Sequence, residues 1–364
     1  MDMTTSCYIH IPFCDDICSY CDFCKIYKRN GQVLRYLDAL EQEIKKHYRG
    51  EKLKTIYIGG GTPSCLKVEE LERLFEILSL LHKEKEIEYT IECNVESITQ
   101  EKLMLFSKYG INRISIGIQT VDDISIQKLN RHHTKESVLK TIELVKKMGF
   151  TNINVDFMYG FPWQTKDSFE KDLQFFLSLD VPHISTYSLI LEEHTVLGNQ
   201  RLTPLDEELE LWMYNTIKET FSQYGYMHYE VSNFARVGYT SKHNLVYWNN
   251  EEYYGFGLGA SGYVNHIRYE NTRSLLKYES GNTVLESHVV TKREDMENEC
   301  ILGLRKLKGI SKETFEKKFS MQIEDVFPIE RLKQKDLLKE QDHYLFIPED
   351  KIYISNEILL EFLD

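Results

Sequence analysis

The sequence has no apolar run long enough to cross a bilayer, and no basic start followed by an apolar stretch and a small-residue cleavage site. These absences predict neither a transmembrane segment nor a secretory signal, so we expect a cytoplasmic protein. An excess of positive charge is missing too: 44 Lys and Arg stand against 57 Asp and Glu, for a formal net charge of −13. Because such a field repels nucleic acid and anionic membranes, we expect neither as a partner.

What the chain does have is length, apolar residues and clustered cysteines. Its 364 residues are 42% hydrophobic, which is enough for one large domain with a smaller appendage. Eight cysteines occur, and four of them fall between Cys14 and Cys24. With no export signal, thiols or metal ligands are favoured over disulfides, because the cytosol keeps cysteines reduced.

Short apolar runs alternate with longer amphipathic stretches through roughly the first half of the chain. The candidate strands begin at Cys7, Lys54, Glu86, Arg113, Asn152 and His183. This alternation is typical of βαβ units and predicts a parallel sheet. Six such strands can form an open sheet or an incomplete (β/α) barrel, whose functional site would lie at the carboxyl ends of the strands.

The alternation stops after about residue 203, which divides the chain into three predicted parts. These are a (β/α)6 core over 1–203, an extension that completes the core over 204–290, and a mainly helical domain over 291–364. In the tail we expect a helix over Ile329–Glu340, a hairpin over Tyr344–Ser355 and a closing helix. This pattern resembles a winged helix, but the tail is acidic and lacks a basic stripe. A packing or lid module is therefore favoured over DNA binding.

Chemistry-bearing residues follow the predicted strands where a barrel would place its site. The cysteine run follows the first strand and GGGTPS the second, while Glu92 with Asn94, then Gln119, then Asp156 close the next three. Glycines after a strand let a ligand approach the main chain closely, although a triple glycine alone is more often a turn. All these residues would share one rim.

The spacing of CDDICSYC places Cys14, Cys18 and Cys21 in one tight loop. Three thiolates can hold a 4Fe-4S cluster and leave one iron open for an outside ligand, since protein clusters usually have four cysteines. Two alternatives stay open at this point. With Cys24 as a fourth ligand, the same loop could bind zinc tetrahedrally or close a cluster that only transfers electrons.

Several blocks, taken in order, resemble the HemN/HemW branch of radical S-adenosylmethionine (SAM) proteins. They are YIHIPFCDDICSYCDF, IYIGGGTPS, NRISIGIQTVDD, VDFMYGFPWQT, HISTYSLILEE, YEVSNFA, HNLVYW and GFGLGASGY. The resemblance covers the chain from Tyr8 onward. It implies a six-stranded partial (β/α) barrel with a C-terminal helical domain, a 4Fe-4S cluster on Cys14, Cys18 and Cys21, and bound SAM as the open iron's ligand.

Family roles carried over by position imply a set of SAM-site residues. They are Tyr8, Tyr20, Gly60, Gly61, Thr62, Glu92, Gln119, Arg131 and Asp156. Carboxylates suit ribose hydroxyls or an ammonium group, and a guanidinium suits a carboxylate. Each could instead be an ordinary polar residue at a strand end. Because all of them are expected at the same rim of the sheet, a SAM-binding site is the favoured interpretation.

The family contains two functions, an oxygen-independent coproporphyrinogen III oxidase and a heme-binding chaperone that passes heme to an acceptor protein. The oxidases carry a longer segment before the cysteines and a fourth cysteine two residues after the third, where Phe23 stands here. The chaperone type is therefore expected, with heme as cargo and a reduced flavodoxin or ferredoxin-like donor. A radical enzyme acting on a tetrapyrrole is the alternative, and a plain electron-transfer or zinc protein is a third.

HNLVYW matches a block typical of the chaperone type and makes His243 a candidate heme ligand. Imidazole is a common axial donor to heme iron, but a structural histidine anchoring a loop is an equally good interpretation. Cys24 departs from the family pattern, and its role stays open. The remaining cysteines are predicted to be buried small apolar residues: Cys7, Cys65, Cys93 and Cys300.

Overall fold

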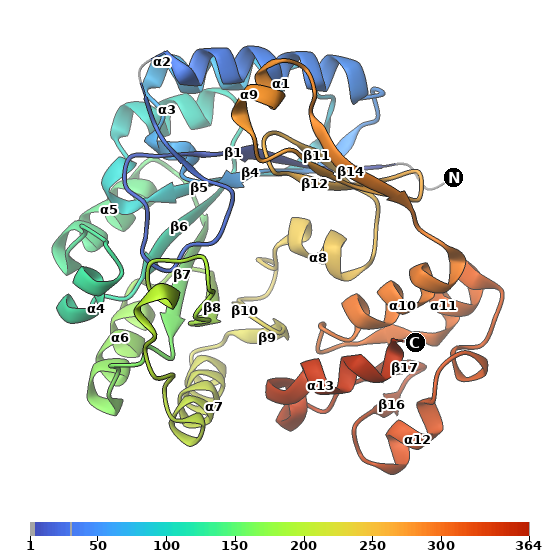
Figure 1. Cartoon of the computed structure of the whole chain (residues 1–364). Coiled ribbons are helices and arrows are strands. Elements are labelled where there is room, and N and C mark those ends of the chain that lie inside the picture. Colours follow the sequence, from blue (N-terminus) through green and yellow to red (C-terminus); the bar gives the residue numbers. More distant parts are fainter. Residues whose placement is uncertain (1–3, 30, 364) are drawn as a thin grey trace.

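A computed structural model describes residues 4–29 and 31–363; the outer limits of the predicted domains, at 1 and 364, lie outside these ranges. Its main element is a nine-stranded sheet in the order β11-β1-β4-β5-β6-β7-β8-β10-β9 (Figure 1). The first six strands of the main sheet along the chain are β1 (Ser6–Ile11), β4 (Leu53–Gly60), β5 (Lys83–Asn94), β6 (Arg113–Gln119), β7 (Asn152–Tyr159) and β8 (His183–Ser188). Each pairs in parallel with the next. The predicted α/β fold with six parallel strands is confirmed.

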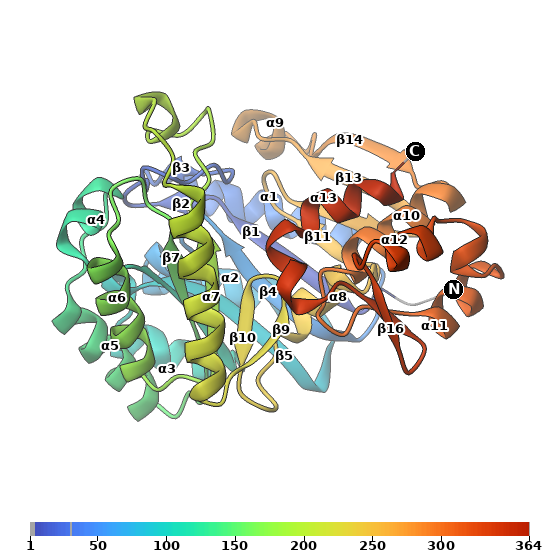
Figure 2. The same ribbon diagram turned by 90° about the horizontal axis from the view of Figure 1, so that it is seen from below.

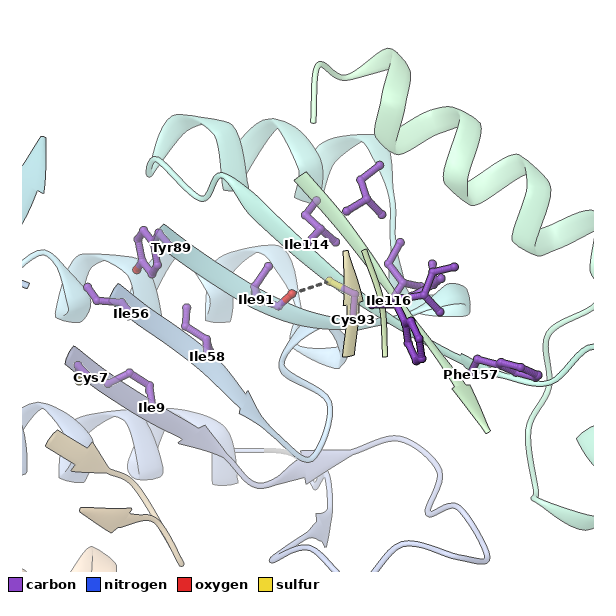
Figure 3. Packing of buried hydrophobic residues seen from close by; sticks show 14 of the residues in the cluster. Cys7, Ile9, Ile56, Ile58, Tyr89, Ile91, Cys93, Ile114, Ile116 and Phe157 are labelled. Atoms are coloured by element: carbon purple, nitrogen blue, oxygen red, sulfur yellow. Dashed lines mark hydrogen bonds between the residues drawn. The ribbon is translucent and has the colours of Figure 1, made fainter. Parts of the chain in front are cut away.

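The strands form because apolar and polar residues alternate along them, which gives the sheet one apolar and one polar face. On β4, Ile56 and Ile58 point to the outer face, where both are fully buried. Figure 3 shows them beside Ile91, Ile114 and the other members of this layer. The apolar layer fixes the register, because a slip of one residue would turn it toward the polar side.

Helices between the strands cover the apolar outer face (Figure 1). They are α1 (Gln32–His47), α2 (Val68–Leu78), α3 (Gln100–Lys108), α4 (Asp123–Lys128), α5 (Lys135–Lys147), α6 (Lys166–Ser178) and α7 (Glu207–Gln223). Several begin where a side chain accepts an otherwise unpaired backbone N–H. Thr134 accepts from Ser137 at α5, and Thr165 accepts from Ser168 at α6.

Segment 204–290 extends both edges of the sheet. Strands β9 (Met227–Glu230) and β10 (Asn233–Ala235) continue beyond β8 in antiparallel pairing, whereas β11 (Tyr254–Phe256) adds in parallel to β1. Helix α8 (Lys242–Trp248) lies on the concave side of the curved sheet (Figure 1). The division of the chain into a core, an extension and a C-terminal domain stays a prediction.

A small antiparallel sheet packs next to β11 and completes this segment. It consists of β12 (Ser261–Val264), β13 (Ile267–Asn271) and β14 (Val284–Val289), with α9 (Leu275–Glu279) between β13 and β14. Every residue of β14 is exposed, because β14 is the free edge of that sheet.

The C-terminal unit is mainly helical, as predicted, and stands beyond the open side of the sheet (Figures 1 and 2). Its helices are α10 (Lys292–Gly303), α11 (Lys312–Phe319), α12 (Ile329–Gln334) and α13 (Ser355–Leu359), with a sheet of β15 (Ile310–Ser311), β17 (Tyr344–Phe346) and β16 (Lys339–Gln341). Among the described residues, no helix has the length and apolar composition needed to cross a membrane.

The hairpin of this unit lies one strand earlier than predicted. The expected helix over Ile329–Glu340 ends at Gln334, and its last residues enter β16. Asp342 and His343 both adopt positive φ, at 50° and 64°, and form a two-residue turn between β16 and β17. Such a turn matches the twist of paired strands, so it fixes the hairpin where no Gly marked it in the sequence.

Candidate functional site

The cysteine loop is fixed at its base by a short parallel pair, β2 (Phe13–Cys14) with β3 (Ile26–Tyr27). The Ile26 N–H donates to the Pro12 carbonyl at 2.8 Å, and the Lys28 N–H donates to the Cys14 carbonyl at 2.9 Å. Within the loop, the Cys21 N–H donates to the Cys18 carbonyl at 3.3 Å. The loop therefore leaves the carboxyl end of β1 and returns to the same place.

Three of its thiols form one electrostatic group. Burial is the main cause that raises the pKa of Cys14 to about 11, and the neighbouring Cys21 and Cys18 contribute to that rise. Burial also raises the pKa of Cys21, which Cys18 again influences. Cys14 contacts the glycine loop as well, since its Sγ lies 3.6 Å from Thr62 Oγ1.

Cys24 lies apart from this group. Burial raises the pKa of Cys24, and the charges that modify it belong to Arg273, Lys25 and Glu270 rather than to another cysteine. Its side chain packs against Gly259, where an added Cβ would lie 2.8 Å from the Cys24 sulfur. The structure thus gathers three thiols and directs the fourth elsewhere.

Within the described part of the chain, no three His, Cys, Asp or Glu side chains are arranged to hold a single metal ion. A zinc site needs four donors converging at about 2.0–2.3 Å on one point. In a 4Fe-4S cluster each thiolate instead binds a different iron, so the sulfurs need not converge. The trio in the loop fits the cluster better than a zinc ion.

The glycine run after β4 has a structural reason that the sequence did not reveal. Gly60 has a φ of 115°, and a Cβ there would lie 2.6 Å from the His10 ring. A Cβ at Gly61 would lie 2.7 Å from the Phe13 carbonyl. The Thr62 N–H donates to that same carbonyl at 2.8 Å. Because glycine has no side chain, the loop that follows β4 can pack directly against the cysteine loop.

Glu92 and Asp156 lie on the inner face of the sheet. Glu92 accepts from the Tyr57 hydroxyl at 2.6 Å and from the Gly60 N–H at 3.0 Å. Asp156 accepts from the Asn154 amide at 2.8 Å. Burial raises the pKa of Glu92 to about 7 and that of Asp156 to about 6. Two carboxyl groups that titrate near neutrality are well suited to bind an ammonium or hydroxyl groups.

Arg131 connects the cysteine loop to the strand ends. Its Nη1 donates to Cys18 Sγ at 3.5 Å and to Asn94 Oδ1 at 3.3 Å, and its Nη2 donates to the Gly117 carbonyl. The Nε of Arg131 is buried and has no hydrogen-bond partner within the described ranges. A free buried donor beside the cluster loop fits a carboxylate ligand.

The remaining predicted residues meet at the same rim. Burial raises the pKa of Tyr20, and Cys18, Arg131 and Asp156 also act on it, so Tyr20 lies among them. The Gln119 side chain folds back over Gly117, where its Nε2 would lie 3.0 Å from an added Cβ. Beside them opens a pocket of about 350 Å³, lined in part by Cys18, Thr62 and Arg131.

Sequence reasoning missed two residues that shape the site. The Tyr57 hydroxyl donates to Glu92, and His10 connects Tyr8 to the cysteine loop. The Nε2 of His10 donates to the Cys24 carbonyl at 2.7 Å, and its Nδ1 lies 3.0 Å from the Tyr8 hydroxyl. The alternation of residues along the strands could have identified them. Tyr8 and His10 alternate with isoleucines on β1, and Tyr57 alternates with isoleucines on β4. Polar or aromatic residues at every second position mark the inner face.

His243 occupies a different part of the concave side. It is 1% exposed, its Nδ1 lies 2.8 Å from Thr55 Oγ1, and its Nε2 lies 2.8 Å from the Tyr247 hydroxyl. Its ring also stacks on Tyr57 at 5.2 Å. Iron ligation by His243 would require one of these hydrogen bonds to break, so the structural role has the stronger support and heme binding by this residue stays a prediction. The four other cysteines are buried, as predicted: Cys7, Cys65, Cys93 and Cys300.

Comparisons with known proteins agree with this geometry. Residues 8–176 match the Radical SAM superfamily, and residues 290–350 match the HemN C-terminal domain. The solved structure of coproporphyrinogen III oxidase (HemN) from Escherichia coli superposes with a TM-score of 0.87 at 23% identity, covering 99% of this chain and 90% of that one. The fold is therefore that of the radical SAM class.

Closer sequence relatives narrow the class. The heme chaperone HemW of Lactococcus lactis is 39% identical over 98% of this chain and 97% of its own length. The heme chaperone HemW of Bacillus subtilis is 38% identical over 98% and 99%, respectively. The chain belongs to the HemW family of radical SAM proteins.

Proposed function

We propose that this protein is a cytoplasmic heme chaperone that carries a 4Fe-4S cluster and SAM and passes heme to an acceptor protein. The observation that carries the proposal is the near full-length identity of 38–39% to two proteins named heme chaperone HemW. The three-thiol loop supports it independently, because it suits a cluster with one open iron.

In this proposal Cys14, Cys18 and Cys21 hold the cluster. Thiolates are the binding form, and the Arg131 guanidinium donates a hydrogen bond to Cys18 Sγ at 3.5 Å. The cluster would sit where β1 ends, against the loop that follows β4. Cys24 takes no part, since its side chain packs on Gly259.

The same rim would hold SAM. The free Nε of Arg131 is suited to its carboxylate, and Glu92 and Asp156 are suited to its ammonium and ribose hydroxyls. Tyr8, Tyr20, Gly60, Gly61, Thr62 and Gln119 complete the proposed set. When bound together, the cluster and SAM supply one-electron and radical chemistry, with electrons from a flavodoxin or ferredoxin-like donor.

Anaerobic reconstitution followed by three parallel assays tests the proposal. Heme titration should show binding, coproporphyrinogen III should not be decarboxylated at an enzymatic rate, and iron and sulfide analysis should give one cluster per chain. Rapid decarboxylation would reject a pure chaperone, and a wild-type protein that fails to bind heme would reject heme carriage.

A second candidate is a radical enzyme that acts on a carboxylate-bearing tetrapyrrole. The inner face of the sheet favours it, because Arg113 is buried there and its Nε has no hydrogen-bond partner among residues 4–29 and 31–363. A buried guanidinium with an unpaired Nε suits a substrate carboxylate. Release of 5′-deoxyadenosine coupled to loss of a propionate carboxyl group would support this candidate.

A further inference from the structure

A second pocket, of about 170 Å³, lies away from the cysteine rim, and we call it the α1–β13 pocket. It is bounded by the C-terminal end of α1, by β11 and by the small sheet that contains β13 and β14. The α1–β13 pocket shares no lining residue with the pocket beside the cysteine loop. The proposed function so far assigns nothing to it.

Its walls are apolar and aromatic. The Tyr254 and Phe256 rings stack in parallel at 5.4 Å. Tyr269 also lines the pocket, and its hydroxyl is hydrogen-bonded to the backbone of Gly255. Ile267 and Val284 form the outer part of the wall and are 38% and 41% exposed. Flat aromatic and aliphatic walls favour a planar apolar ligand.

The apolar surface continues past the pocket along the free edge strand β14. Leu285 is 55% exposed and Val289 is 69% exposed. The pocket is too small for a whole tetrapyrrole, so only one edge of such a ring could enter it. The remainder would lie over this exposed strand, which suits a ligand that must later be released.

Two cationic or metal-binding side chains stand at the mouth, His47 at the end of α1 and Arg49 two residues later. Neither side chain makes a hydrogen bond or an ion pair with any described residue. Burial and the neighbouring Lys46 lower the pKa of His47, so its imidazole is neutral at pH 7 and can bind iron without losing a proton.

The other histidines are less suitable as heme ligands. Three of them use both ring nitrogens in hydrogen bonds: His10, His183 and His243. His132 and His288 face Asp16 and Glu294, respectively. Within the described ranges, His47 is the histidine that lines an apolar-walled pocket and has no hydrogen bond.

A hydrogen-bonded polar cluster around Glu43 closes the floor of the pocket. Glu43 accepts from the Gly257 N–H at 2.9 Å, from the Tyr278 hydroxyl at 2.5 Å and from the Asn271 amide at 2.6 Å. These bonds tie α1 to β13 and keep the pocket walls in place. The inner face of the main sheet is more polar, because it carries the ionisable side chains of Glu92, Asp156 and Arg113.

We propose that the α1–β13 pocket is the docking site for heme, an inference that rests on the proposed function. One edge of the ring enters between Tyr254 and Ile267, an imidazole nitrogen of His47 replaces water on the iron, and Arg49 pairs with a propionate. The binding step is ligand exchange, so no electron is transferred.

The test is a titration of full-length, cluster-reconstituted protein with ferric heme and, separately, with its dimethyl ester, followed in the Soret region. His47→Ala should lose the Soret shift and bind both compounds at least tenfold more weakly. Arg49→Gln should weaken binding of heme severalfold but leave the ester unchanged, because the ester has no carboxylate. Val284→Asp should weaken both.

His194→Ala, an exposed histidine outside both pockets, is the matched control and should bind like the wild type. Cluster absorbance and circular dichroism confirm folding of each variant. If the wild type binds heme and His47→Ala, Arg49→Gln and Val284→Asp bind equally well, the pocket is rejected while the chaperone function stands. Loss of the heme spectrum in His243→Gln alone would return the ligand to His243. Failure of the wild type to bind heme would reject both proposals.

Discussion

The Arg131 guanidinium donates from one side to the Cys18 sulfur at 3.5 Å and presents on another side a buried Nε with no partner among the described residues. The Arg131 side chain thus contacts Cys18, a proposed cluster ligand, and also lines the neighbouring pocket. This relationship explains how a bound carboxylate and a cluster thiolate can be held in a fixed mutual position.

We predict that Arg131→Gln weakens SAM binding by roughly tenfold to a hundredfold, because a charge-assisted hydrogen bond contributes about 1.5–3 kcal/mol. The change in the electron paramagnetic resonance spectrum of the reduced cluster on SAM titration gives the affinity. Arg273→Gln is the control, since the exposed Arg273 pairs with Glu270 and lies beside Cys24. Equal affinity in both variants would contradict the role of Arg131.

Single replacements of the loop cysteines should divide into two classes. Cys14→Ala, Cys18→Ala and Cys21→Ala should each lose the cluster, because each removes a thiol from the mutually interacting group. Cys24→Ala should keep it. Iron and sulfide content after anaerobic reconstitution is the measurement, and loss of iron in Cys24→Ala would indicate a closed four-cysteine site.

Gly60→Ala should destabilise the protein more than Gly110→Ala does. Both positions have positive φ, at 115° and 81°, so both variants carry backbone strain of roughly 1 kcal/mol or more. Only at Gly60 would the new methyl group meet the His10 ring, at 2.6 Å, whereas nothing lies within 4 Å at Gly110. We expect a further loss of about 1–3 kcal/mol in the free energy of unfolding for Gly60→Ala.

Urea unfolding of both variants measures that difference. Similar free energies of unfolding would show that His10 moves aside without cost. In that case the glycine run would be required by φ alone.

Glu230 should make stability fall as the pH rises. It is fully buried, accepts from the Ser232 N–H at 3.1 Å and from the Asn233 amide, and its pKa is raised by burial from 4.5 to about 7. The folded protein therefore keeps a proton between pH 4.5 and 7 that the unfolded chain releases. Stability from this group is complete below pH 4.5 and is lost as the pH rises through 7.

Glu230→Gln removes this titration, so its free energy of unfolding relative to the wild type should rise between pH 5 and pH 8. The upper limit is roughly 3 kcal/mol, given about 1.4 kcal/mol for each pKa unit. Denaturant unfolding at several pH values measures it, with exposed Glu101→Gln as the control. A difference that does not change with pH would contradict the prediction.

Local sequence patterns were enough to predict the strands and most of the rim. Isoleucines at alternate positions of β4 and β6 define a buried outer face whatever the surroundings, and parallel strands place their carboxyl ends together. The hairpin of the C-terminal unit was placed wrongly, because positive φ at Asp342 and His343 has no glycine to announce it.

The parallel sheet, the three-cysteine spacing and the polar residues at one rim can all be predicted from the sequence, because each depends on local periodicity or on short separations along the chain. The packing of the elements sets the rest: the Cys24 side chain contacts Gly259, Arg131 donates to Cys18, both ring nitrogens of His243 are hydrogen-bonded, and the His47 side chain has no partner among the described residues. Those outcomes depend on contacts between residues more than 100 positions apart, which become fixed when the elements pack together.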